Sequence, residues 1–205
     1  MSRLDELLPK VELPAGERET AKIDHFTLTE EEAARFNLSL MFGGQGHRAV
    51  SPGSYTRLHA DGQLQMTDTP AERRDHLAPV RAATGTCLVT GLGLGMIAQA
   101  MARKSEVSHV LVIERNQDVI DLVAPHLSPK VEVICADALE WKPPKGERWD
   151  VIWHDIWPTV CLDDAPSRNL LSRRYARRWR VYHGAWAKDE IKRMQSEARR
   201  SQPFW

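Results

Sequence analysis

The sequence has few cysteines, and their spacing is informative. Its 205 residues include only Cys87, Cys135 and Cys161, and no two of them form a C-x-x-C pair. This spacing argues against a structural zinc site, and we expect no metal. An odd number of cysteines, two of them inside apolar runs, favours reduced thiols and a cytoplasmic protein.

Long apolar runs are also missing. The most apolar stretch, CLVTGLGLGMIAQAMA at residues 87–102, is interrupted by three glycines and is shorter than a membrane span. The first 20 residues lack the apolar core of a secretion signal. With 42% hydrophobic and 27% charged residues, the composition predicts a soluble globular protein that has its own core and no membrane contact.

Two common nucleotide-binding motifs are absent as well. The run GLGLG places glycines at Gly91, Gly93 and Gly95, whereas the dinucleotide pattern G-x-G-x-x-G would need a glycine in place of Met96. No G-K-[ST] follows, which excludes a P-loop. A glycine turn still lets a ligand approach the backbone, although such glycines also serve simply to pack a helix against a strand.

From residue 86 onward the pattern becomes regular. Short apolar runs predict strands at 86–91, 109–114, 131–137 and 149–155, and helical patterns separate the first three at 95–105 and 116–127. This alternation predicts parallel strands with right-handed crossovers. We expect an α/β Rossmann-like three-layer sandwich with a small, mostly parallel sheet and a helical C-terminal tail, because no convincing strand follows Asp155.

The segment before this core predicts a more loosely organised region. Residues 1–22 are polar and contain two prolines, which predicts an extended or loosely ordered start. A helix is expected from about Thr29, a loop over GGQGHRAVSPGSY, a hairpin turning at Asp61-Gly62, and a helix over 70–83 with Thr69 as its cap. The predicted organisation is an N-terminal extension at 1–78, a core at 79–163 and a basic tail at 164–205.

Carboxylates stand at the ends of the predicted strands. Glu114 closes the second strand, 19 residues after Gly95, where it can accept both hydroxyls of a ribose. Asp137 closes the third strand, and an acid there suits the exocyclic amine of an adenine, with the backbone N–H of Ala138 facing a ring nitrogen. Each acid could also be an ordinary helix cap.

The fourth strand ends in VIWHDIWP, so His154, Asp155 and Trp157 are expected at the ligand crevice of the sheet. We take Asp155 as the first candidate for orienting or deprotonating an acceptor, with His154 second. A structural role for His154 is an equal alternative. Gln65 and His76 would line the acceptor side if the hairpin folds over the crevice.

These motifs resemble those of class I S-adenosylmethionine-dependent methyltransferases and of their relatives, the spermidine synthases. The glycine spacing is that of methyltransferase motif I. The hairpin resembles the spermidine synthase pattern D-G-x-x-Q-x-T-E through Asp61, Gly62, Gln65, Thr67 and Asp68. The resemblance covers about residues 55–160, and it implies S-adenosylmethionine as the cofactor. The residues it assigns to cofactor binding are Gly91, Leu92, Gly93, Gly95, Glu114, Arg115, Asp137, Ala138 and Asp155.

The sequence departs from the spermidine synthases at three points. Leu94 stands where their glycine motif has an aspartate, and Pro158 stands at their second catalytic aspartate. The helix before the glycine strand keeps acids and His76 but lacks their tyrosine. We therefore expect methyl transfer to a small molecule or an exposed group, such as an amine, and the sequence does not identify the acceptor. Aminopropyl transfer to a polyamine, cleavage of the cofactor, and a binding module without turnover are the alternatives.

The charge is unevenly distributed along the chain. Residues 165–205 carry 11 Lys or Arg and 3 Asp or Glu, a net of +8 that the rest of the chain balances. Arginines alternate there with Tyr175, Trp179 and Tyr182, which suits nucleic acid, but an amphipathic helix docked on the acidic body is the favoured interpretation. A small sheet with an open edge also predicts a homodimer.

Overall fold

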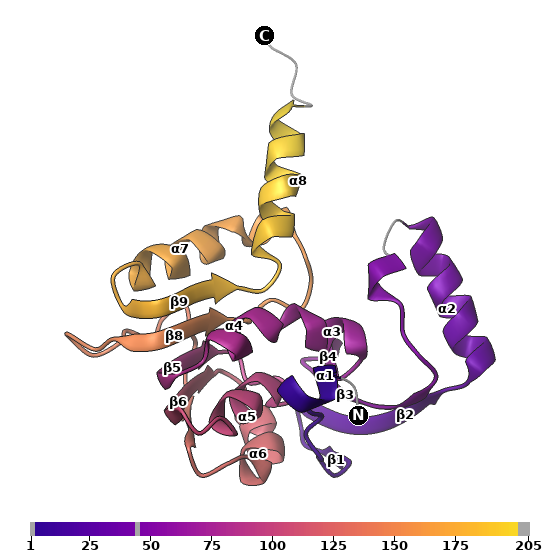
Figure 1. The fold of residues 1–205 in the computed structure, drawn as a ribbon, viewed down its shortest axis with the longest axis horizontal. Helices are drawn as coiled ribbons and strands as arrows, with labels where there is room; N and C mark the ends of the chain where they lie inside the picture. The colour runs from indigo at the N-terminus through magenta and orange to yellow at the C-terminus, as the bar shows by residue number, and fades with distance from the viewer. Residues whose placement is uncertain (1–2, 44–45, 201–205) are drawn as a thin grey trace.

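The computed structural model describes residues 3–43 and 46–200. Gly44 and Gln45 of the expected loop, and residues 201–205 of the expected tail, lie outside the described residues. The chain forms two sheets with helices around them (Figure 1). None of the described helices is long and apolar enough to cross a bilayer.

The central sheet has five strands in the order β7-β6-β5-β8-β9, and every neighbouring pair is parallel. The order reverses between β5 and β8, which is the switch point where open α/β sheets form their ligand crevice. The strands are β5 (Gly85–Thr90), β6 (Val107–Glu114), β7 (Val131–Cys135), β8 (Trp149–His154) and β9 (Trp179–Ala185). The expected Rossmann-like α/β fold is confirmed.

Helices cover both faces of this sheet, as a three-layer sandwich requires. Cys87, Val89 and Val151 point to one face, which packs against α4 (Leu77–Ala82), α5 (Met96–Ala102) and α6 (Gln117–Val123). Leu88 and Ile152 point to the other face, which packs against α7 (Ala165–Tyr175). Alternation along parallel strands buried on both faces explains the unbroken apolar runs in the sequence.

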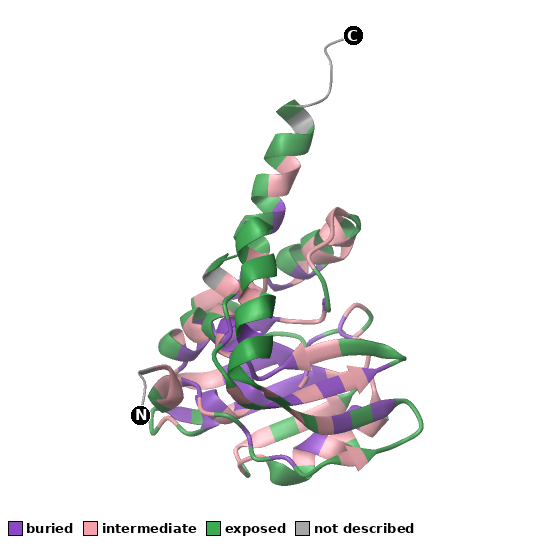
Figure 2. Cartoon of the chain, turned by 90° about the vertical axis from the view of Figure 1, so that its right-hand side faces the viewer, coloured by how far each residue is buried: buried purple, intermediate pink, exposed green. Residues whose placement is uncertain are grey.

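The expectation that no strand follows Asp155 is wrong, because β9 pairs with β8 along the edge of the sheet. The predicted helical tail is instead α7, β9 and α8 (Lys188–Arg200). Most residues of α8 are exposed, and the helix extends away from the body (Figure 2). The segment WRVYHGA has one largely exposed face and lies beside a run of arginines, so its alternation did not stand out.

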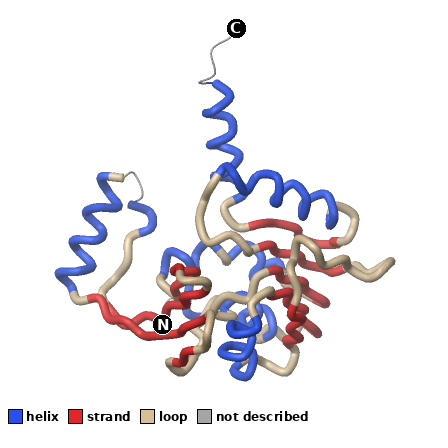
Figure 3. Tube along the Cα trace, turned by 180° about the vertical axis from the view of Figure 1, so that it is seen from behind, coloured by secondary structure: helices blue, strands red, loops and turns tan. Residues whose placement is uncertain are grey.

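The N-terminal region forms a separate antiparallel sheet in the order β1-β2-β3-β4. The predicted hairpin is present as β3 and β4, and helix α2 begins after the predicted Thr29, which makes a capping box with Glu32. Figure 3 shows α2 apart from the central sheet, at the end of β2. The elements are α1 (Arg3–Leu7), β1 (Gly16–Glu17), β2 (Ala21–Leu28), α2 (Glu30–Phe42), β3 (Gly53–Ala60) and β4 (Gln63–Thr67).

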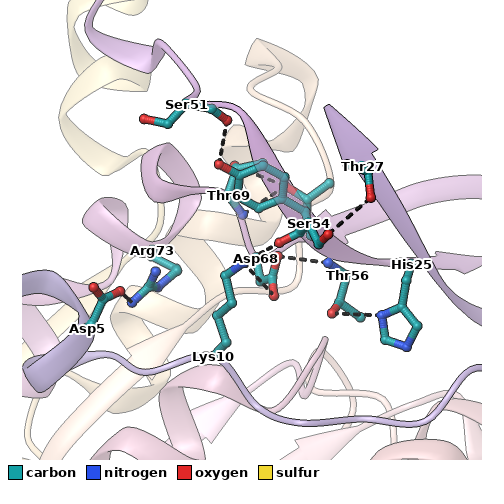
Figure 4. A network of polar contacts seen from close by, with 12 residues as sticks. Asp5, Lys10, His25, Thr27, Ser51, Ser54, Thr56, Asp68, Thr69 and Arg73 are labelled. Carbon is teal, nitrogen blue, oxygen red and sulfur yellow. Dashed lines mark hydrogen bonds and ion pairs between the residues drawn. The ribbon is translucent and has the colours of Figure 1, made fainter. Parts of the chain in front are cut away.

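Residues 3–22 are more regular than the sequence predicted. The buried guanidinium of Arg73 donates to the carbonyl oxygen of Leu8 and pairs with Asp5 at 2.8 Å (Figure 4). Lys10 donates to the carbonyl of Ser54 at 2.5 Å, and its Nζ lies 3.9 Å from Asp68. These long-range contacts hold the start of the chain against β3 and the helix that follows β4.

That helix is interrupted, whereas the sequence predicted one continuous helix over 70–83. Pro70–Asp75 forms α3, and α4 begins at Leu77 after a break at His76. Pro70 occupies the start as expected, but the Thr69 side chain makes no capping hydrogen bond. The break matters for the site because it carries the His76 side chain to the end of β8.

Candidate functional site

A pocket of about 570 Å³ lies at the carboxyl ends of β5, β6, β7 and β8. Its size falls within the range of small-molecule and cofactor sites. The sequence-predicted residues that line it are Gln65, Gly91, Gly93, Glu114, Arg115, Asp137, Ala138, Asp155 and Trp157. The structure therefore brings together the glycine turn, three strand-end carboxylates and the hairpin.

The glycine turn needs its glycines for two reasons. Gly91, Gly93 and Gly95 all have positive φ, at 91°, 53° and 72°. A Cβ on Gly91 would lie 2.0 Å from the backbone oxygen of Asp155, and one on Gly93 would lie 2.7 Å from the sulfur of Met66. The turn is thus packed between the end of β8 and the hairpin, with bare backbone along the pocket. Gly95 lies behind the pocket as the N-cap of α5.

Glu114 is held by the turn that it faces. Its Oε2 accepts a hydrogen bond from the backbone N–H of Leu92 at 2.8 Å, and its Oε1 accepts one from Asn116 at 2.9 Å. Leu92 therefore positions the acid instead of lining the pocket. Each carboxylate oxygen keeps further acceptor capacity, so Glu114 can also accept two hydroxyl groups.

Asp137 is positioned in a similar way at the end of β7. Its Oδ1 accepts from the backbone N–H of Leu139 at 2.7 Å, while Oδ2 has no hydrogen bond among the described residues. The loop behind it is fixed by Arg174 of α7, which donates to the carbonyl oxygens of Ala138, Leu139 and Trp141 at 2.6–3.0 Å. The sequence offered no signal for this clamp.

Asp155 is the most perturbed acid of the pocket. Its side chain is 7% exposed, and burial raises its pKa to about 7, helped by the nearby carboxylates of Glu72 and Asp75. The Nε2 of His76 lies 3.6 Å from Asp155 Oδ2, which is too long for a hydrogen bond. Burial lowers the pKa of His76 to about 4, so this contact joins a neutral imidazole to the acid at neutral pH.

Besides Leu92 and Gly95, two further predicted residues lie outside this pocket. His76 does not line it and instead backs Asp155 from the break between α3 and α4. His154 points to the opposite face of the sheet, where its Nδ1 lies 3.0 Å from Thr90 Oγ1 and its Nε2 lies 3.1 Å from His183 Nε2. Neighbouring residues at a strand end face opposite sides, so His154 and Asp155 do not share one site.

Other pocket residues were missed by sequence reasoning. Asp163 and Asp164 line the pocket from the segment before α7, and Asn116 and Met66 line it as well. Asp61 lines it from the hairpin turn and pairs with Arg115 at 3.0 Å, which bridges the hairpin to the end of β6. Six carboxylates thus face one arginine, so the pocket favours a cationic ligand. Among the described residues, no group of acids, histidines and cysteines is arranged to hold a metal ion.

Three arginines of the basic tail make contacts within the fold. Arg174 holds the loop after β7, and Arg178 donates to the carbonyl oxygens of Pro144 and Glu147. Arg168 donates to the carbonyl of Trp186 and stacks on Trp157 at 3.9 Å. These contacts favour the interpretation of the tail as a part of the body. The homodimer stays a prediction.

Comparisons with known proteins found solved structures that are similar at low sequence identity. No family model and no curated protein matches this chain. A DhpI–SAM–HEP complex is similar over 64% of this chain and 60% of its own, at 16% identity and a TM-score of 0.46. A spermidine synthase from Thermotoga maritima is similar over 73% and 49%, at 15% identity and a TM-score of 0.38. The chain thus spans about half to three fifths of these proteins.

The strand order, the glycine turn and the strand-end acids define the class of fold. It is a Rossmann-like α/β fold with a five-stranded parallel sheet and a ligand crevice at its switch point. A fold of this kind supports many activities, so the activity of this chain has to be argued from its pocket.

Proposed function

We propose that this protein is an S-adenosylmethionine-dependent methyltransferase that acts on an amine. The observation that carries the proposal is the meeting of Glu114, Asp137 and Asp155 around one pocket beside a turn of bare backbone. Acids at the ends of β6, β7 and β8 match the three parts of the cofactor's surroundings: ribose, adenine and reacting group.

The residues present fit this cofactor. Glu114 would accept the ribose hydroxyls with the acceptor capacity that Leu92 and Asn116 leave free. The unbonded Oδ2 of Asp137 would accept from the adenine amine, and the backbone N–H of Ala138 would donate to the ring. Gly91 and Gly93 line the pocket with bare backbone, which would let the remainder of the cofactor approach closely.

When bound, the cofactor supplies an electrophilic methyl group on a sulfonium centre. The chain's own residues hold the acceptor and take its proton. Asp155, with a pKa of about 7, is ionised in a substantial fraction of molecules at neutral pH and can accept the proton of an ammonium or amine. His76 and the surrounding helix break keep water from one side of this carboxylate.

A second transfer reaction has one observation in its favour. Asp155, Asp163 and Asp164 line the same pocket, and such an acidic rim suits a polyamine. Two positions argue against aminopropyl transfer. Leu94 is buried and apolar, whereas the glycine motif of spermidine synthases has an aspartate at this position. Pro158 stands at the position of their second catalytic acid. Nucleic-acid binding through the tail receives less support, because its arginines bond within the fold.

The test is a transfer assay with methyl-labelled S-adenosylmethionine and a panel of amines, with decarboxylated S-adenosylmethionine in parallel. We expect label in an amine product and release of S-adenosylhomocysteine. Product from the decarboxylated cofactor alone would replace the proposal with aminopropyl transfer. Tight cofactor binding without any product would identify a binding module without turnover.

A further inference from the structure

A second cavity, of about 160 Å³, lies beside the ends of β8 and β9, on the face of the sheet that α7 covers. It is bounded by α7, by the end of β9 and by the first turns of α8. Residues of all three elements contribute polar side chains, among them Ser172, Asn169 and Gln195. One water molecule occupies about 30 Å³ in the liquid, so the cavity has room for a polyatomic ion.

The charge of this cavity is of one sign. Arg168, Lys188 and Lys192 line it, and no aspartate or glutamate is among the described residues that do. Lys188 and Lys192 are four residues apart on α8 and therefore lie on the same face of that helix. Cations gathered around a hollow without a carboxylate favour an anionic occupant.

Arg168 carries donors that the fold does not use. Its Nη1 donates to the carbonyl oxygen of Trp186, but Nε and Nη2 are buried and have no hydrogen-bond partner among the described residues. A buried donor left without a partner costs about 1–3 kcal/mol, and more when it is charged. The guanidinium fork matches two oxygens of a tetrahedral oxyanion.

Two uncharged imidazole side chains also line the cavity. His154 and His183 both line the cavity, with their Nε2 atoms 3.1 Å apart. Burial, with a smaller contribution from Lys188, lowers the pKa of His183 to about 4. Burial also lowers the pKa of His154, helped by His183, Arg174 and Lys188. A negative ion in the cavity would offset the contribution of the cations.

We propose that this cavity is a binding site for a phosphate-like oxyanion, held by Arg168, Lys188 and Lys192. The inference goes beyond the proposed function and does not depend on it. It also gives a place to His154, which the sequence suggested as a catalytic residue and the structure removes from the reaction pocket.

The test is calorimetric titration of the full chain with inorganic phosphate at constant ionic strength. We expect a Kd of about 1 mM or tighter. The double variant Lys188→Gln/Lys192→Gln should weaken binding at least about tenfold. The matched control is Lys142→Gln/Lys145→Gln, which removes the same two charges from exposed positions outside the cavity and should bind as the parent protein does. Thermal unfolding confirms that both variants fold.

A second arm uses a short single-stranded DNA to separate the sources of the phosphate group. If the Lys188/Lys192 variant loses phosphate binding, the ligand is a free oxyanion. If phosphate does not bind and this variant alone loses DNA binding, the ligand is a backbone phosphate. Addition of phosphate should also shift the imidazole proton resonances of His154 and His183. Equal weakening in both double variants, or no binding of either probe, would overturn the inference.

Discussion

The Nε2 of His76 lies 3.6 Å from the Oδ2 of Asp155, and both side chains are almost completely enclosed. The two groups titrate in opposite directions from their usual values, because burial lowers the pKa of His76 to about 4 and raises that of Asp155 to about 7. The proposed reaction site therefore places an acid of near-neutral pKa against an uncharged imidazole. Its energetic consequences can be measured without knowing the acceptor.

Asp155→Asn should stabilise the protein at pH 8. The folded-state pKa is raised above the unfolded value, so the folded chain binds more protons between about pH 4 and 7 and stability falls as the pH rises through that window. Asparagine removes the ionisation, and we expect a gain of roughly 1–4 kcal/mol at pH 8 and little change at pH 4. Urea unfolding at both pH values measures it.

The control for this variant is Asp121→Asn, which removes an exposed carboxylate of α6. It should change stability by less than about 0.5 kcal/mol at either pH. Equal effects of the two substitutions, or a loss of stability in Asp155→Asn at pH 8, would show that Asp155 is not the perturbed group.

Methyl transfer should depend on the ionised form of Asp155. We expect kcat/KM to rise with pH through about 7 and then level off, as the carboxylate becomes able to accept a proton. Asp155→Asn should lower the rate by about 10²–10⁴-fold while S-adenosylmethionine still binds. A pH profile that is flat between pH 5.5 and 8.5 would contradict the proton-acceptor role.

Gly91→Ala should be strongly destabilising. Its φ of 91° disfavours a side chain, and the new Cβ would meet the backbone oxygen of Asp155 at 2.0 Å. Strain and displaced backbone together should cost about 3 kcal/mol or more. Gly146→Ala is the matched control, since φ is 85° there and no atom lies within 4 Å of the added Cβ. A similar loss in both would mean that the turn and β8 are not in close contact.

Arg174→Gln should weaken cofactor binding from a distance. The side chain holds the carbonyl oxygens of Ala138, Leu139 and Trp141, which form the loop after Asp137. Charged hydrogen bonds of this kind contribute about 1.5–3 kcal/mol each before compensation, so we expect lower stability and a several-fold higher Kd for S-adenosylmethionine. Arg173→Gln changes an exposed neighbour whose side chain makes no hydrogen bond among the described residues, and it should leave both unchanged.

The parallel core could be predicted because each of its strands is marked by a pattern within a short stretch of sequence. Strands buried on both faces read as continuous apolar runs, and the glycine turn and acids mark where each strand ends. Glu114, Asp137 and Asp155 were therefore placed correctly at one edge. β9 was missed because its first three residues are exposed and its contacts join positions that are distant in the sequence, as the hydrogen bond from Arg180 to the carbonyl oxygen of Arg148 does.

The assignment of His154 shows a second limit. The sequence shows that His154 lies at the end of a strand, but it does not show to which face of the sheet the side chain points. In the structure, His154 pairs with Thr90, and both side chains lie on the face covered by α7. Asp163 and Asp164 were missed for another reason. They precede α7, and only the packing of that helix carries them to the pocket.

The central claim is that Glu114 and Asp137 hold an adenosyl cofactor. It is tested most directly by calorimetric titration of the parent protein, Glu114→Gln and Asp137→Asn with S-adenosylmethionine, with NAD as the competing ligand. We predict binding to the parent, at least about tenfold weaker binding to each variant, and no effect of Glu147→Gln, an exposed acid outside the pocket. Unchanged binding in both pocket variants, or binding of NAD alone, would contradict the account.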